Sequence, residues 1–358
     1  MRHSIDTRSG DARAGRFAGL FAAAFLVLAA APLAAQEASK ITPALIEAAK
    51  KEGKVSFYTS VEVQVAEKVG KAFEAKYPGI TVQVERSGSE RIFQRIGQEY
   101  SSKIHAADVI STSDAAHFII WKKDGWLAPH LPEDVALHFP KDQGDKDHAY
   151  APWRLSLSVI GYNTKLLKPE EAPKGLKDLL DPKWSGKIVK AHPSYSGTIL
   201  TATFQIARDL GWDYYEKLGK QKVLQVQSAT EPPKKLSIGE RAVMADGNEY
   251  VLLQLKEQGN PVEVVYATEG SPLIISPSAI LKNAPHPNAA RLFQNFLFTA
   301  EAQQLLIDVG GMRSFHAQAK EKEGRKSLKD IKVMKEDAEA VVKEVEAIKE
   351  RYTKYFGT

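Results

Sequence analysis

Three short segments, VSFYTS (55–60), ITVQVERSGS (80–89) and ADVISTSD (107–114), decide the fold of this chain. Each contains a run of apolar and β-branched residues that predicts a buried strand. Between them, residues 65–73 and 92–100 carry apolar side chains at helical spacing. Strands that alternate with helices of this length predict parallel βαβ units, and hence an α/β fold with a covered sheet.

Small hydroxyl residues and glycines follow the predicted strands, where the next helix begins. Such side chains can cap helices. The same edge of an open α/β sheet is also where ligands bind, because helix N-termini and free backbone N–H groups meet there. Three such loops on one sheet edge predict a binding crevice. Its candidate ligand-binding residues are Thr59, Ser60, Ser87, Ser89 and Ser113.

A second series of strands and helices begins near residue 152. The predicted strands are 155–162, 188–189, 223–226, 242–244, 261–267 and 273–275, and the predicted helices cover 200–210, 287–298 and 300–309. This pattern predicts two α/β lobes. The chain is expected to cross between them near 151–154 and again near 246–261.

The predicted lobes are discontinuous in sequence. Lobe 1 is expected to consist of residues 36–151 and 262–326, and lobe 2 of residues 152–261. Residues 327–358 form a C-terminal helical extension, in which apolar residues recur every three or four positions over 337–356. We expect this helix to pack on one lobe, and a heptad seam for dimerisation is the alternative.

The first 35 residues have the order of a signal peptide. Arginines precede an apolar run at 20–31, and Leu33 and Ala35 suit the −3 and −1 positions of a cleavage site. The apolar run is short for a membrane span, although a retained anchor is the alternative. No Cys follows it, which excludes a lipoprotein. We expect a mature protein that begins near Gln36 and reaches a periplasm by the general export route.

The composition excludes several classes of function. The 358 residues include no Cys and carry a formal net charge of +5. An exported chain without Cys has no disulfide, no thiol catalysis and no thiolate metal site. The charge is small and mixed in sign, which excludes nucleic acid as a partner and leaves a weak bias towards anionic ligands.

The catalytic motifs that a sequence can display are absent. There is no G-x-S-x-G, no G-x-x-x-x-G-K-[ST], no G-x-G-x-x-G and no H-E-x-x-H. The His residues are scattered; we expect those at 105, 117, 130, 138 and 148 to be surface side chains. We therefore expect a binding protein, with no cofactor and no enzymatic activity.

Four stretches carry a resemblance to a known family: GYNT (161–164), LDPKWSGK (180–187), PSYSGT (193–198) and the tail at 327–357. They resemble the periplasmic solute-binding proteins of ABC importers, in the group that binds ferric ion, 2-aminoethylphosphonate, thiamine and sugar phosphates. The resemblance spans nearly all of the predicted mature chain. It implies a two-lobed type II, Venus-flytrap fold with a two-segment hinge, which closes on a ligand and docks transiently with a cognate inner-membrane ABC permease. We expect a monomer.

The resemblance also implies an anion-binding corner at Ser196, Gly197 and Thr198. The glycine lets the backbone approach closely, and the two hydroxyls with the helix N–H groups suit phosphate, phosphonate or carboxylate.

Three further side chains are candidates on their own chemistry. Arg154, on the first crossing, offers a planar fork to an anion, with an interlobe salt bridge as the alternative. Trp153 and Tyr195 can stack on an organic ligand or pack at a lobe edge.

Ferric-ion binders of this group supply two adjacent tyrosines from the second crossing. The matching stretch here is Asn248-Glu249-Tyr250, with Glu at the first tyrosine position, which argues against binding of a naked ferric ion. The family's acidic ligand falls near Ser113 or Asp114, and its His falls near Glu62. Tyr250 is therefore a ligand-binding candidate. The metal alternative would use Glu62, Asp114, Glu249 and Tyr250, which are hard oxygen donors.

The sequence thus predicts a periplasmic substrate-binding component of an ABC transporter. Its solute is expected to be a small anionic organic molecule, such as a phosphonate, a phosphate ester or a carboxylate. The alternatives are a ferric-iron or iron–anion binding protein, a secreted enzyme on the same fold, and the ligand-presenting partner of a two-component sensor.

Overall fold

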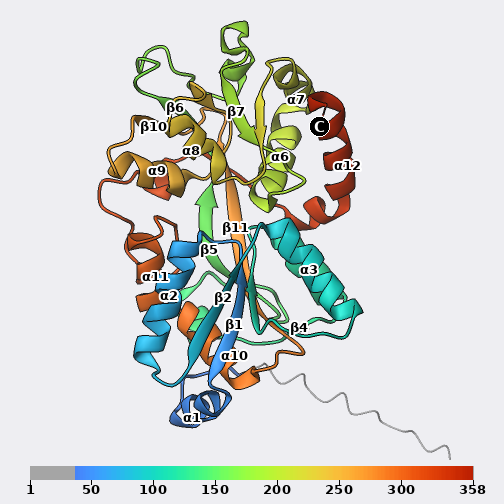
Figure 1. The fold of residues 1–358 in the computed structure, drawn as a ribbon, viewed down its shortest axis with the longest axis vertical. Helices are drawn as coiled ribbons and strands as arrows, with labels where there is room; N and C mark the ends of the chain where they lie inside the picture. The colour runs from blue at the N-terminus through green and yellow to red at the C-terminus, as the bar shows by residue number, and fades with distance from the viewer. Residues whose placement is uncertain (1–36, 358) are drawn as a thin grey trace, which may run out of the picture. The chain divides into compact units, whose positions relative to one another are not determined.

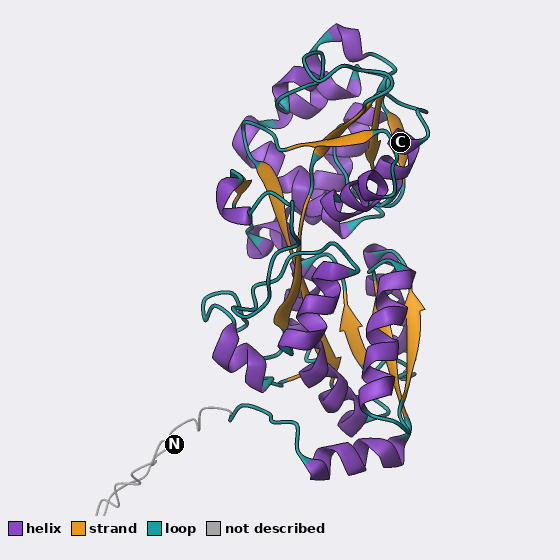
Figure 2. Ribbon diagram, turned by 90° about the vertical axis from the view of Figure 1, so that its left-hand side faces the viewer, coloured by secondary structure: helices purple, strands orange, loops and turns teal. Residues whose placement is uncertain are grey.

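The computed structural model describes residues 37–357, so the predicted signal peptide at 1–35 lies outside the described residues. Two sheets organise these residues, and Figure 2 shows helices flanking the strands of both. We call the part built on the seven-stranded sheet lobe 1 and the part built on the five-stranded sheet lobe 2. The predicted α/β fold class is confirmed. None of the described helices combines the length and hydrophobicity needed to cross a membrane.

The sheet of lobe 1 has the strand order β12-β11-β3-β1-β2, with β4 and β5 also paired to β11 (Figure 1). Its strands are β1 (Lys54–Thr59), β2 (Thr81–Arg86), β3 (Val109–Ser111), β4 (Leu127–Ala128), β5 (Ala151–Leu157), β11 (Ser271–Leu281) and β12 (Val333–Met334). The helices are α1 (Pro43–Glu52), α2 (Val63–Lys76), α3 (Ser89–Ser101), α4 (Ala115–Lys123), α5 (Glu133–His138), α10 (Pro287–Leu297) and α11 (Ala300–Asp308). As predicted, β1 is parallel to β2 and to β3.

The sheet of lobe 2 has the strand order β10-β6-β9-β7-β8. Its strands are β6 (Ile160–Asn163), β7 (Ile188–Ala191), β8 (Leu224–Val226), β9 (Val243–Met244) and β10 (Val262–Val265). The helices are α6 (Gly197–Leu210), α7 (Trp212–Gly219), α8 (Glu231–Ser237) and α9 (Glu249–Glu257), with short 3₁₀ turns η1 (Lys177–Leu180) and η2 (Pro182–Trp184). The tail adds η3 (Leu328–Asp330) and α12 (Ala338–Phe356).

Aromatic packing on β1 forms the core of lobe 1. The ring of Phe57 contacts Trp153 and Phe293 edge-on, with centroids 5.6 and 5.2 Å apart. β1 is buried over five consecutive residues because helices cover both faces of the sheet. Trp153 is fully buried in this core, so it does not stack on a ligand.

The LDPKWSGK motif anchors the core of lobe 2. Asp181 accepts a hydrogen bond from the backbone N–H of Lys183, which fixes the short η2 turn. That turn buries Trp184, and Gly186 leaves it with a positive φ of 73°. The motif therefore has a structural role in packing lobe 2.

The crossings between the lobes differ from the expected ones. The predicted strand at 155–162 is two strands, β5 in the first sheet and β6 in the second, so the first crossing lies between them. The predicted second crossing at 246–261 contains α9, and β10 still pairs with β6 in lobe 2. We therefore propose that lobe 2 spans residues 158–270. The sequence did not show the first crossing because the apolar run at 155–162 continues from one sheet into the other.

The C-terminal helix α12 contacts both lobes instead of one. It packs against α4 of lobe 1. It also packs against α6 and α7 of lobe 2 (Figure 1). Its apolar stripe, with Val341, Ile348 and Tyr352 buried, faces the chain's own helices. This stripe is therefore already covered within one molecule, as in the docked-helix interpretation.

His130 is buried, against the expectation of a surface side chain. Its Nε2 lies 2.9 Å from Oδ1 of Asn295, which ties the loop after β4 to α10. Burial lowers the pKa of His130 to about 4. His117 is also buried.

We predict that His130 makes the fold acid-sensitive. Above its ordinary pKa of about 6.5, the ring is neutral in both the folded and the unfolded state. As the pH falls from there towards 4, only the unfolded state takes up the proton, so the free energy of unfolding decreases, by up to about 3 kcal/mol. Urea titrations of wild type and His130→Gln at pH 7 and pH 4.5 should show a smaller decrease in the variant. Equal decreases would contradict the prediction.

Candidate functional site

A narrow cleft, partly open to solvent, lies between the lobes. Residues from both sheets line it: Ser60, Arg86, Gly88, Ser89, Ser113 and Arg154 from lobe 1, and Tyr195, Ser196, Thr198, Ser228, Ala229, Thr230, Asn248 and Tyr250 from lobe 2. Two arginines are the only charged residues in this lining, which therefore carries no carboxylate.

Three helices begin at the cleft. α3 begins after Gly88, α6 after Ser196 and α9 after Asn248. None of these preceding residues caps its helix through a side chain. Apart from the N–H of Gly197, which donates to Ser89, the first N–H groups of each helix are therefore left for another acceptor, and they carry the partial positive charge of the helix dipole. Helix capping was the alternative role for the polar residues that follow the strands. Asp114 has this role, because its side chain accepts from the N–H of Ala116 at the start of α4.

A hydrogen-bonded seam closes one wall of the cleft. Oγ of Ser89 accepts the N–H of Gly197 at 2.9 Å and lies 3.0 Å from Oγ of Ser113. The seam joins α3 and the end of β3 in lobe 1 to the start of α6 in lobe 2. A Cβ on Gly197 would lie 2.6 Å from Cβ of Asp114, so only glycine permits this approach.

Arg154 is a buried cation in the cleft without a carboxylate partner. Its side chain is almost inaccessible, at 3% relative exposure, and its Nη2 donates to Oγ of Ser60 at 3.3 Å. Nε of Arg154 has no hydrogen-bond partner, and no acidic residue of the described chain forms an ion pair with it. Burial, with a smaller contribution from the nearby Arg86, lowers its pKa to about 10. Of the two expected roles, the interlobe salt bridge is therefore not formed.

Arg86 is a second cleft cation, which the sequence analysis missed. It ends β2, and its Nε donates to the backbone oxygen of Val61 at 3.4 Å. No described carboxylate forms an ion pair with it. Its position in the sequence could have indicated this role. It lies directly before the Ser87-Gly88-Ser89 loop, which was predicted to lie at the carboxyl end of a strand, where ligands bind.

The structure brings most of the predicted ligand-binding residues to this cleft. Those that line it are Ser60, Ser89, Ser113, Arg154, Tyr195, Ser196, Thr198 and Tyr250. Gly197 lies in the seam. Thr59 is fully buried and its Oγ1 accepts from the N–H of Val61, and Ser87 is not among the lining residues.

Four further lining residues were not predicted because the sequence pattern did not show the helices that follow them. Ser228, Ala229 and Thr230 form the loop between β8 and α8, and α8 was not predicted. Asn248 immediately precedes α9, and the sequence pattern predicted a crossing between the lobes at this place.

The four candidate metal ligands do not assemble into one site. Arg313 and Arg325 bind the carboxylate of Glu249, and Tyr266 donates to it at 2.6 Å. Glu62 pairs with Lys234 across the lobes at 3.1 Å. Of the four, Tyr250 alone lines the cleft, and burial raises its pKa to about 12, which opposes the deprotonation that ferric binding needs.

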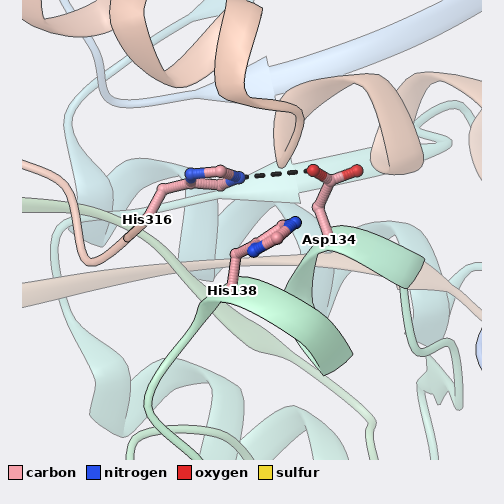
Figure 3. Close-up of side chains that lie close together, drawn as sticks. All are labelled: Asp134, His138 and His316. Carbon is pink, nitrogen blue, oxygen red and sulfur yellow. Dashed lines mark hydrogen bonds and ion pairs between the residues drawn. The ribbon is translucent and has the colours of Figure 1, made fainter. Parts of the chain in front are cut away.

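A second cluster, Asp134, His138 and His316, lies outside the cleft (Figure 3). Nδ1 of His316 accepts the N–H of Gln318 at 3.1 Å, so its Nε2 carries the ring proton and faces Asp134 Oδ1 at 3.2 Å. A metal on Nε2 would require that proton to move to Nδ1, where the Gln318 N–H already points. The cluster is therefore explained by its hydrogen bonds, which tie α5 to the segment after α11.

Comparison with known proteins gives a consistent picture. Residues 106–338 match the family described as bacterial extracellular solute-binding protein. An uncharacterized protein of Haemophilus influenzae is 27% identical over 269 residues, which cover 72% of this chain and 76% of that protein.

Solved structures of similar fold come from periplasmic binding proteins. AfuA from Actinobacillus pleuropneumoniae, with fructose-6-phosphate bound, aligns with a TM-score of 0.79 and 25% identity, over 86% of this chain and 99% of AfuA. P5PA aligns with a TM-score of 0.76 and 23% identity, over 85% and 99% of the two chains. Iron-bound HitA from Pseudomonas aeruginosa aligns with a TM-score of 0.73 and 22% identity, over 84% and 99%. The predicted two-lobed type II fold is confirmed. The family and these structures are binding proteins.

We predict that Gly197→Ala holds the lobes apart. The added methyl group would collide with Asp114 across the seam, and overpacking of this kind costs about 1–3 kcal/mol. Because the collision lies between the lobes, opening relieves it without unfolding either lobe. Small-angle X-ray scattering should show a larger radius of gyration for Gly197→Ala than for wild type.

Gly97→Ala is the matched control. Gly97 lies within α3, and a Cβ there would meet nothing within 4 Å. Equal scattering curves for the two variants would contradict the proposed collision.

Proposed function

Because this chain belongs to the bacterial extracellular solute-binding protein family, we propose that its cleft captures a small anionic organic solute for import by an ABC transporter. Proteins of this family bind small ligands and dock with ABC permeases. The proposal adds the chemistry of the solute: a phosphonate, a phosphate ester or a carboxylate. It keeps the expectation of a periplasmic monomer.

The observation that carries the proposal is the uncompensated charge of Arg154. A buried cation without a counter-ion is costly, and a bound anion would remove that cost. The guanidinium fork matches the oxygens of a carboxylate or phosphate. Arg86 adds a second positive charge near it, so the lining favours a ligand with two negative charges, such as a phosphate monoester or a dicarboxylate.

The opposite wall supports the same chemistry. The hydroxyls of Ser196 and Thr198 line the cleft and form no hydrogen bond within the described residues. They lie at the start of α6, whose dipole favours a negative group. Tyr195, exposed at 46%, stands beside them and offers a ring face to the organic part of the solute.

Binding of this kind explains why the lobes would close. A solute that contacts Arg154 on lobe 1 and Thr198 on lobe 2 has both sets of contacts only in the closed state. It therefore stabilises the closed state by the difference between its affinities for the closed and the open state.

The lining contains no Asp, Glu, His or Lys, so it offers no general base near neutral pH for an enzymatic reaction.

We predict that Arg154→Gln weakens binding of the solute. A thermal-shift panel of phosphonates, sugar phosphates, dicarboxylates, aromatic acids, thiamine and ferric citrate should raise the melting temperature of the wild type with one anionic class. Loss of a charged hydrogen bond of about 1.5–3 kcal/mol should weaken binding by 10-fold or more in Arg154→Gln. Arg291→Gln, on the exposed face of α10, is the control and should behave as wild type.

Two outcomes would refute this proposal. One is stabilisation by ferric ion alone with a visible charge-transfer band. The other is an anion whose affinity is the same for wild type and Arg154→Gln.

We also predict that Thr198→Glu prevents binding while the fold is kept. The carboxylate would lie at the start of α6, occupying the N–H groups and repelling the solute. Calorimetry with the anion identified above should detect no heat of binding, and circular dichroism should match the wild type. Retained affinity would remove the start of α6 from the site.

A further inference from the structure

The C-terminal helix α12 is anchored in lobe 2 by its last turns. The hydroxyl of Tyr352 accepts from the buried Lys190 Nζ at 2.8 Å and donates to Gln225 at 2.7 Å. Its ring stacks on Phe356, with centroids 4.2 Å apart, inside the core of lobe 2. This end of the helix should therefore move with lobe 2.

The earlier turns of α12 contact lobe 1. Val341 and Ile348 form one apolar cluster with Ala116 of α4 and with Leu200 and Phe204 of α6. The cluster thus contains residues of both lobes, and α12 covers it.

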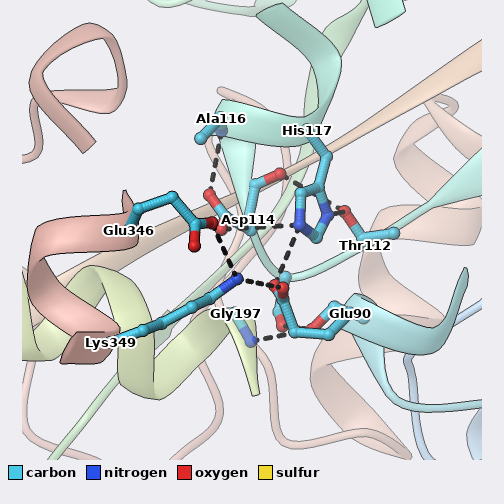
Figure 4. A network of polar contacts seen from close by, with 10 residues as sticks. Glu90, Thr112, Asp114, Ala116, His117, Gly197, Glu346 and Lys349 are labelled. Carbon is cyan, nitrogen blue, oxygen red and sulfur yellow. Dashed lines mark hydrogen bonds and ion pairs between the residues drawn. The ribbon is translucent and has the colours of Figure 1, made fainter. Parts of the chain in front are cut away.

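An ion pair lies beside this cluster (Figure 4). Lys349 extends from α12 to Glu90 on lobe 1, with 3.3 Å between Nζ and Oε2. The side chain of Glu90 is 6% exposed and that of Lys349 is 25% exposed, so water screens this pair little. Glu90 follows Ser89 in α3, and Ser89 makes the seam to Gly197.

The other partners of Glu90 belong to lobe 1. Nε2 of His117 lies 3.0 Å from Oε1 of Glu90 and 3.7 Å from Oδ2 of Asp114. Nδ1 of His117 lies 3.1 Å from the hydroxyl of Thr112. These groups keep their positions when the lobes separate, so Lys349 is the member of this network that crosses between the lobes.

We propose that α12 is an interlobe clasp, in which the Lys349–Glu90 pair and the apolar cluster stabilise the closed cleft before any solute binds. Opening the seam would carry Lys349 away with lobe 2 and leave Glu90 without that cation. The clasp reduces the part of the solute's binding energy that is spent on closure, and it therefore raises the apparent affinity. This role is independent of which solute the cleft takes.

The test uses the absence of Cys from the chain, so that introduced cysteines are the only labelling sites. Spin labels at Lys68→Cys on α2 and Lys217→Cys on α7, both exposed, report the distance between the lobes by double electron–electron resonance. Without solute, the wild-type background should show a short, closed distance beside the longer, open one. Lys349→Met should lower the ratio of closed to open molecules about tenfold, as expected for one partly buried ion pair.

Two variants control for charge and packing. Lys343→Met changes an exposed lysine on the same helix and should match the wild type. Lys349→Arg restores the pair and should return most of the closed population. If Lys349→Met does not melt cooperatively, Lys349→Gln is measured in the same way.

Three results would overturn the clasp. The first is a wild type that shows only the open distance. The second is a folded Lys349→Met or Lys349→Gln protein with the wild-type distribution of distances. The third is a distribution in Lys343→Met that shifts as much as in Lys349→Met. None of them depends on a bound solute, so failure of the clasp is distinguishable from failure of the proposed function.

Discussion

Burying a guanidinium without a carboxylate is unfavourable, and Arg154 is held in that state at the centre of the cleft. Its backbone position on β5 is fixed by pairing with β11, where Arg154 lies opposite Ser276, and by the packing of the neighbouring Trp153 on Phe57. With the lobes closed, the guanidinium is desolvated and held in place, which suits it to the anion that we propose as ligand.

Closure of the cleft depends on close contact at the seam. Gly197 allows the start of α6 to reach Asp114 and Ser89, where a side chain would collide. The hydroxyls of Ser89 and Ser113 are used in this contact, whereas those of Ser196 and Thr198 are not. The small hydroxyl residues thus differ in role: Ser89 joins the lobes through Gly197, whereas Ser196 and Thr198 line the cleft.

Much of the site follows from local rules. The carboxyl ends of β1, β2 and β3 share one edge because parallel strands must, so Ser60, Ser89 and Ser113 were predictable from the residue pattern. The resemblance to solute-binding proteins added Ser196 and Thr198. Thr59, also a predicted ligand-binding residue, does not line the cleft: side chains alternate in direction along a strand, and its hydroxyl accepts the backbone N–H of Val61.

The sequence by itself determined the α/β class, the two lobes and the absence of thiol chemistry, because hydrophobic periodicity and composition are local properties. It did not determine the partners of charged residues. Glu249 and Glu62 looked equally available as ligands, yet Arg313 holds one and Lys234 holds the other. Tertiary structure decided those pairings, the burial of His117 and His130, and the contact of α12 with both lobes, since each joins residues far apart in the chain. Arg154 illustrates both contributions. The sequence determines its charge, whereas the tertiary structure leaves it without a carboxylate partner among the described residues.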